Sequence, residues 1–179
     1  SVNKDGVIIY EDWKGYEDTY RKHHTSSVTR DIWAYRPAAE EQKLTIDGNG
    51  SFTRLSKFEG EDRNPVFAAD GDTFYYLSEA DGTFNIYKSS LSAPEKTTQL
   101  TFEKGNPVRY LSVSDNGVLS YSYDGELYTL KEGGKPSKVE VKIITDQIER
   151  PVVEQTLTSG ATALSVSPDG KEVAIVLRG

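Results

Sequence analysis

The stretch NPVFAADGDTFYYLSEADGTFNIY, residues 64–87, is followed by a second version of itself, NPVRYLSVSDNGVLSYSYDGELY, residues 106–128. Both begin with Asn-Pro-Val, pass through two Gly turns and end on Tyr, and matching residues lie 41 to 43 positions apart. A fixed period of about 40 to 45 residues, made of short strands and Gly turns, is typical of β-propeller blades. The repeat therefore predicts an all-β chain built from blades of four antiparallel strands.

The rest of the chain can be divided around this repeat. We expect residues 1–62 to form an irregular first blade with an inserted loop and a hairpin, and residues 63–104 and 105–144 to form one blade each. Residues 145–179 then supply a linker and the start of a further blade. The predicted strands make about three and a half blades, whereas a closed propeller has about 4 to 8. We therefore expect an incomplete propeller, a portion of a larger protein whose exposed blade edges favour self-association.

Composition excludes several classes of function. The chain has 28 acidic and 21 basic residues and a net charge of −7, so it lacks the basic stripe that nucleic-acid binding requires. It has no cysteine, which excludes disulfides and thiolate metal sites. No run of about 18 apolar residues is present, so we expect no membrane span.

The polar motifs give no complete catalytic or metal site. His23 and His24 are the only histidines, and adjacent side chains point away from each other on a strand, so they are poorly placed to bind one metal. We interpret them as part of a charged loop that hydrogen-bonds across blades. The turn at residues 47–51 fails the calcium-loop pattern, since Phe52 and Phe58 occupy the positions that need Gly and Glu. Neither a Gly-x-Ser-x-Gly elbow nor a phosphate-binding loop occurs, and we expect no catalytic residue and no cofactor.

The aromatic residues are expected in the core. They fall at alternating strand positions or at equivalent points of successive blades, where large rings fill the space between sheets. The set consists of Trp13, Trp33, Tyr35, Tyr75, Tyr76, Tyr87, Tyr121, Tyr123 and Tyr128.

Longer motifs carry a family resemblance. The phrase SVSPDGKEVA, residues 165–174, looks like the strand-turn-strand signature of TolB-type and tricorn-type propellers. The stretches YRKHHTSSVTRDIW, residues 20–33, and FEGEDRNPVF, residues 58–67, resemble the amino-terminal propeller of bacterial tricorn protease homologues. This resemblance covers essentially the whole chain.

The resemblance implies part of a large serine peptidase of the carboxyl-terminal-processing type. In that family the nucleophilic Ser and its His lie in a separate core, and no position of this chain matches their motifs. The chain is thus expected to be non-catalytic and to gate or dock peptide substrates, with peptides or the other domains of the parent protease as partners. The family favours a periplasmic over a cytoplasmic bacterial location.

Two alternatives stay open: a TolB-like propeller that only binds a protein partner, and the propeller lid of a prolyl-oligopeptidase-type hydrolase. Because propeller function lies in the connecting loops, the predicted contact residues at the channel or its loops are Arg21, His23, His24 and Arg30.

Overall fold

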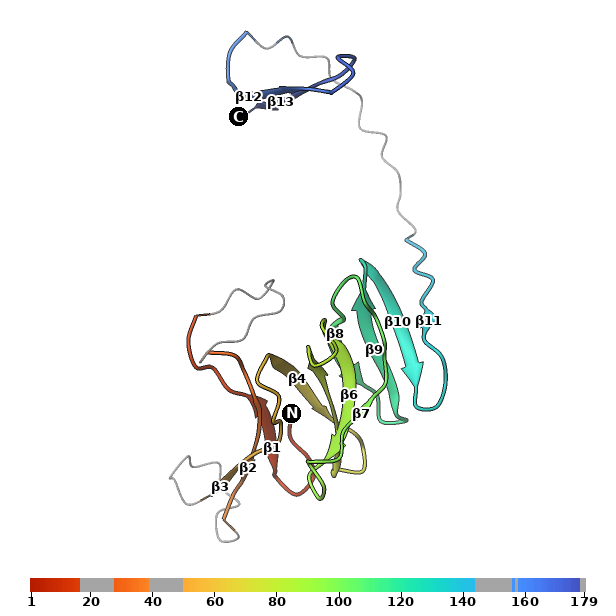
Figure 1. Cartoon of the computed structure of the whole chain (residues 1–179). Coiled ribbons are helices and arrows are strands. Elements are labelled where there is room, and N and C mark those ends of the chain that lie inside the picture. Colours follow the sequence, from red (N-terminus) through yellow and green to blue (C-terminus); the bar gives the residue numbers. More distant parts are fainter. Residues whose placement is uncertain (17–27, 39–49, 144–155, 157, 178–179) are drawn as a thin grey trace. The chain divides into compact units, whose positions relative to one another are not determined.

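The computed structural model describes residues 1–16, 28–38, 50–143, 156 and 158–177. The chain separates into two compact units, Ser1–Val141 and Lys142–Gly179. All regular elements of the described residues are β-strands, and neighbouring strands pair antiparallel (Figure 1). The predicted all-β class with four-stranded antiparallel blades is therefore confirmed.

The first sheet of the Ser1–Val141 unit has three strands, in the order β1 (Ile8–Glu11), β2 (Ile32–Arg36) and β3 (Ser51–Arg54). Val2 forms an isolated antiparallel bridge with Ile8 on the free side of β1. Val2 thus lies beside β1 at the position where the second and third sheets, described next, have a complete first strand. The predicted strand at residues 43–46 lies outside the described residues.

The second and third sheets each have four strands joined in chain order. The second contains β4 (Asp62–Phe67), β5 (Thr73–Ser78), β6 (Asn85–Ser90) and β7 (Thr98–Gln99). The third contains β8 (Arg109–Val113), β9 (Val118–Tyr123), β10 (Glu126–Lys131) and β11 (Ser137–Lys138). The outermost strands β7 and β11 have only two residues each, shorter than the segments that the sequence pattern predicts.

The turn between β9 and β10 shows why Asp-Gly pairs mark the hairpins. Tyr123 pairs with Glu126, so only two residues make the turn. Asp124 and Gly125 have φ angles of 50° and 77°, the two positive values that a type I′ turn requires. Gly adopts such angles without steric cost, and Asp is among the few other residues that tolerate them.

Two apolar layers hold the three sheets together. One packs Ile9, Ile32, Ala34 and Leu55 of the first sheet region against Phe67, Phe74, Tyr76 and Tyr87 of the second. The other packs Tyr75, Leu77, Phe84 and Ile86 of the second sheet against Val108, Leu111, Leu119, Tyr121 and Leu130. The second sheet is therefore buried on both faces, and each fully buried large side chain stabilises the fold by about 1.5 to 3 kcal/mol.

The innermost strands β4 and β8 contain matching bulges. The pairing shifts between Arg63 and Val66 in β4 and between Arg109 and Ser112 in β8. The structural equivalent of Asn64 (φ 53°) is therefore Tyr110 (φ 55°). The sequence alignment, which matched the two Asn-Pro-Val phrases, is wrong at this point because the second phrase ends before β8 begins.

The Lys142–Gly179 unit contains one hairpin, β12 (Ala161–Val166) and β13 (Val173–Leu177). The turn between them is closed by the Gly170 N–H, which donates to the Ser167 carbonyl over 2.9 Å. This confirms the strand-turn-strand pattern predicted around Pro168.

Candidate functional site

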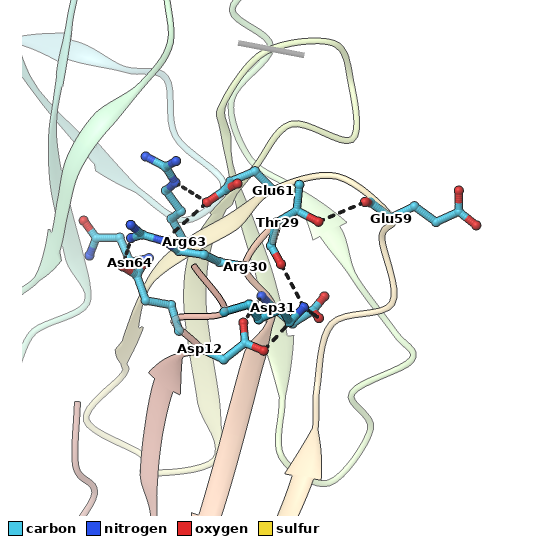
Figure 2. A network of polar contacts seen from close by, with 10 residues as sticks. Asp12, Thr29, Arg30, Asp31, Glu59, Glu61, Arg63 and Asn64 are labelled. Carbon is cyan, nitrogen blue, oxygen red and sulfur yellow. Dashed lines mark hydrogen bonds and ion pairs between the residues drawn. The ribbon is translucent and has the colours of Figure 1, made fainter. Parts of the chain in front are cut away.

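The densest polar network of the described residues lies where β1 ends, β2 begins and β4 starts (Figure 2). The backbone joins these segments: the Asp62 N–H donates to the Arg30 carbonyl over 3.0 Å. The Glu79 N–H likewise donates to the Glu61 carbonyl over 3.2 Å. The network therefore lies at strand ends that backbone hydrogen bonds join to one another.

Two arginines share one buried carboxylate at the centre of this network. The Nε atom of Arg63 donates to Glu61 Oε1 over 2.6 Å, and the Nε atom of Arg30 lies 3.6 Å from the same oxygen. Arg30 also donates from Nη1 to Glu11 Oε1 over 2.5 Å. The side chains of Arg30 and Glu61 are only 8% and 3% exposed, so these charges are largely removed from water. Such charges must be paired to be tolerated.

Asn64 connects the network to the third sheet. Its backbone N–H donates to Glu11 Oε2 over 2.7 Å, and its side-chain Nδ2 donates to the Leu111 carbonyl over 3.0 Å. Asn64 makes these two contacts, to β1 and β8, from a backbone conformation with a positive φ angle of 53°. Asn adopts this conformation more readily than most residues do.

A second cluster fixes the loop of residues 12–16 that follows β1. Lys14 Nζ donates to the Thr29 carbonyl over 2.8 Å and to Asp31 Oδ2 over 2.5 Å. Burial lowers the pKa of Lys14, but hydrogen bonds and charge from Asp31 and Asp12 outweigh it and the pKa is raised. Arg54 Nη2 donates to the other oxygen of Asp31 over 2.6 Å. The buried Asp31 carboxylate is thus the anchor of the loop.

Trp13 lies on the solvent side of this network. The guanidinium carbon of Arg30 is 4.3 Å from the centroid of its ring, a cation–π contact. Trp13 is nevertheless 66% exposed, and Tyr16 in the same loop is 89% exposed. The expectation that Trp13 belongs to the core is wrong: its ring lies over the Arg30 guanidinium, which is paired with Glu11 and Glu61, and most of the residue stays exposed.

The predicted contact residues fall into two groups. Arg21, His23 and His24 lie outside the described residues. Arg30 is described and is 6% exposed. Its side chain positions Trp13 and pairs with Glu11 and Glu61, whereas sequence reasoning had treated Arg30 as a direct contact. The sequence feature that could have indicated this site is the Trp13-Lys14 pair, which lies in the same polar stretch before β2.

Neither a metal-binding cluster nor a helix fit to span a membrane occurs in the described residues. No group of three or more His, Cys, Asp or Glu side chains among them is placed to hold a metal ion. In the same part of the chain, no helix is long and apolar enough to cross a membrane. An open pocket of about 430 Å³ lies at the other end of β1, and its lining includes Lys4, Arg36, Asp70 and Asp72. It lies away from the Arg30 network.

The comparisons with known proteins support the fold. No known protein family and no curated protein matches the chain. Among solved structures, it is similar to that of putative TolB from Agrobacterium tumefaciens, with 19% sequence identity and a TM-score of 0.53. The likeness covers 76% of this chain and 46% of the putative TolB chain, so this chain spans less than half the length of that protein. At this identity the likeness shows the fold alone, a TolB-like β-propeller, and the tricorn protease relationship stays a prediction.

Proposed function

We propose that this chain is a protein-interaction module that binds extended peptide segments at the loop of residues 12–16. The observation that carries the proposal is the exposed Trp13 ring, stacked on a buried and fully ion-paired Arg30. Trp, Tyr and Arg are the residue types most enriched at the energetic centres of protein interfaces. Here the Trp13 ring lies on Arg30, and the exposed Tyr16 lies in the same short loop as Trp13.

Preorganisation strengthens this proposal. Lys14 is tied to Asp31 and to the Thr29 carbonyl, which restricts the backbone on the carboxyl side of Trp13. Asp12 accepts the Asp31 N–H over 2.7 Å and the Trp33 indole N–H over 3.2 Å on its amino side. A ring that is already held in place loses little conformational freedom on binding, which favours affinity.

We further infer that this module serves a tricorn-like serine protease, where it docks or gates peptide substrates for a catalytic core outside this chain. The sequence resemblance of residues 20–33 and 58–67 supports this role. In such a protease, Trp13→Ala is expected to raise KM for a ten-residue peptide. It should leave kcat for a small chromogenic substrate unchanged, because that substrate is too short to reach the propeller.

The second candidate is an interaction module without any peptidase, and the similarity to putative TolB favours it. Both candidates bind a peptide at the propeller, and they differ in whether the bound peptide is then hydrolysed. A full-length chain that binds peptides through Trp13 but cleaves none would favour the TolB-like role.

The binding proposal is tested with a phage-displayed library of random twelve-residue peptides selected on the chain. We expect an enriched peptide to bind at least about tenfold more weakly to Trp13→Ala, since central interface residues contribute about 2 kcal/mol or more. Phe102→Ala is the matched control, because Phe102 is also an exposed aromatic, at 67%, on a different connection. Equal loss in both variants, or no enrichment at all, would overturn the proposal.

Self-association through blade edges is proposed as a separate property. The β12–β13 hairpin exposes Leu164, Val173 and Ile175, each more than half exposed. In the described residues this sheet has only two strands, so each keeps an unpaired edge beside its apolar surface, and both features promote association. Sedimentation velocity is expected to show concentration-dependent dimers, and a strict monomer at high concentration would contradict this.

A further inference from the structure

Asp62 is the most deeply buried carboxylate of the interface between the first and second sheets. It is 1% exposed, and in the described part of the chain neither of its oxygens has a hydrogen bond of ordinary geometry. The hydroxyls of Ser56 and Ser78 lie close enough to favour its charged form. Each hydroxyl oxygen already accepts a backbone N–H, from Ile32 and Ala80 respectively, so each hydroxyl proton remains to be donated toward Asp62.

The charged and titratable groups that act on Asp62, or on which Asp62 acts, come from four neighbouring strands or strand ends. Asp31, at the start of β2, opposes its ionisation, and Arg54 of β3 favours it. Tyr76 of β5 and Tyr87 of β6 feel the Asp62 charge, which helps to raise their own pKa values after burial. Arg54 thus acts on both carboxylates, as a hydrogen-bond donor to Asp31 and as a favourable charge for Asp62.

Asp31 is the link from this space to the Trp13 loop. Its two oxygens hold Lys14 at 2.5 Å and Arg54 at 2.6 Å. The side chain of Arg54 is 44% exposed, and its charge acts on Asp62 as well as on its ion-pair partner Asp31. Any shift of Arg54 toward Asp62 changes the partners of Asp31 and, through Lys14, the position of the loop.

We propose that Asp62 is a proton-controlled switch for the Trp13 loop, closed while its carboxyl is neutral and loosened when the carboxyl ionises beside Asp31. This inference rests on the proposed function in one respect: if the Trp13 loop binds peptides, the switch makes that binding depend on pH. Ionisation draws Arg54 from Asp31 and favours entry of water between the sheets, because a buried unpaired charge is costly.

The direction of the pH dependence follows from burial. Burial raises the pKa of Asp62 to about 6, above the usual 3.8, against the opposing effect of the two serine hydroxyls. The closed state therefore binds a proton more tightly than an open, hydrated state does. Lowering the pH through 6 closes the loop, and raising it loosens the loop.

The experiment follows the two tryptophan indole N–H signals of the ¹⁵N-labelled full chain between pH 4.5 and 8. They are assigned with Trp13→Phe, since the chain has 2 Trp residues. We expect the Trp13 signal to titrate with a midpoint near pH 6 in the wild type and to be flat in Asp62→Asn. Ser78→Ala removes a donor that favours the charged form, so its midpoint should move upward, and this variant decides the matter if Asp62→Asn does not fold.

The Asp62→Asn variant separates the titration of Asp62 from that of every other group of the chain. A transition that persists in Asp62→Asn, or a midpoint unmoved in Ser78→Ala, would overturn the switch, as would a flat wild-type signal. This readout needs no partner, so the switch is tested even if peptide binding fails. With an enriched peptide in hand, affinity should be about tenfold higher at pH 5 than at pH 7.5, one pKa unit of coupling, and independent of pH in Asp62→Asn.

Discussion

Glu61 is expected to contribute more to stability than any other charge of the network. Its side chain is 3% exposed and lies between the guanidinium groups of Arg63 and Arg30, at 2.6 Å and 3.6 Å. Replacing Glu61 by Gln keeps the shape but leaves two positive charges facing a neutral amide. Removing one partner of a buried ion pair costs about 3 to 5 kcal/mol, and we expect a value of about 3 because Gln still offers one acceptor oxygen.

Glu11→Gln is the matched control for Glu61→Gln. Glu11 also pairs with Arg30, but its side chain is 32% exposed and water compensates part of the loss. We expect a cost of about 1 kcal/mol there, in the range of partly exposed pairs. The Arg30 charge is the same in both variants, so the difference reports the burial of the carboxylate.

Urea unfolding followed by circular dichroism at pH 7 and 25 °C measures both variants. A double-mutant cycle with Arg63→Met then gives the coupling between Glu61 and Arg63, for which we expect about 1 to 3 kcal/mol. Equal losses in Glu61→Gln and Glu11→Gln, or no coupling to Arg63, would refute the reasoning. The burial of the Glu61 carboxylate would then make no difference to its contribution to stability.

Further predictions concern strain, a buried amide and pH. Tyr110→Asn should raise the free energy of unfolding by about 1 kcal/mol, because a bulky residue at positive φ is strained; an unchanged urea midpoint would count against that strain. Asn85→Ala should lower it by about 2 to 4 kcal/mol, because Asn85 is 0% exposed and accepts from Thr101 Oγ1 over 2.9 Å; a loss below 1 kcal/mol in thermal unfolding would contradict this. Ionisation of Asp62 should lower wild-type stability by about 3 kcal/mol as the pH rises from about 4 to above 6, since two pKa units correspond to that energy. Urea titrations at pH 4.5 and 7.5 should show about 2 of these 3 kcal/mol lost in the wild type, and no such loss in Asp62→Asn.

Local signals made the fold predictable from sequence. The Asp-Gly and Asn-Gly pairs fix hairpins by their own conformational preferences, so turns such as Asp124-Gly125 were located correctly. The strands between them follow from aromatic and β-branched runs. The bulges could not be located in this way, because the shift at Arg109 depends on how β8 pairs with β9 and leaves no local mark.

The candidate site was only partly predictable, because its members are far apart in the chain. Glu11, Arg30 and Glu61 meet only after two sheets have packed. Sequence reasoning singled out the polar stretch before β2, which does contain Arg30, but treated Trp13 as core. Which face of an arginine is left for a ring depends on where its carboxylate partners lie, and only the tertiary structure shows that.

The burial of β5 on both faces has a consequence for how this chain can change over evolutionary time. Phe74 and Tyr76 belong to one apolar layer, while Tyr75 and Leu77 belong to the other. Adjacent residues of β5 are therefore constrained by different neighbours. Substitutions at Tyr75 and at Tyr76 are compensated by separate sets of residues. Duplicated blades can thus diverge on one face while the other face keeps its original partners.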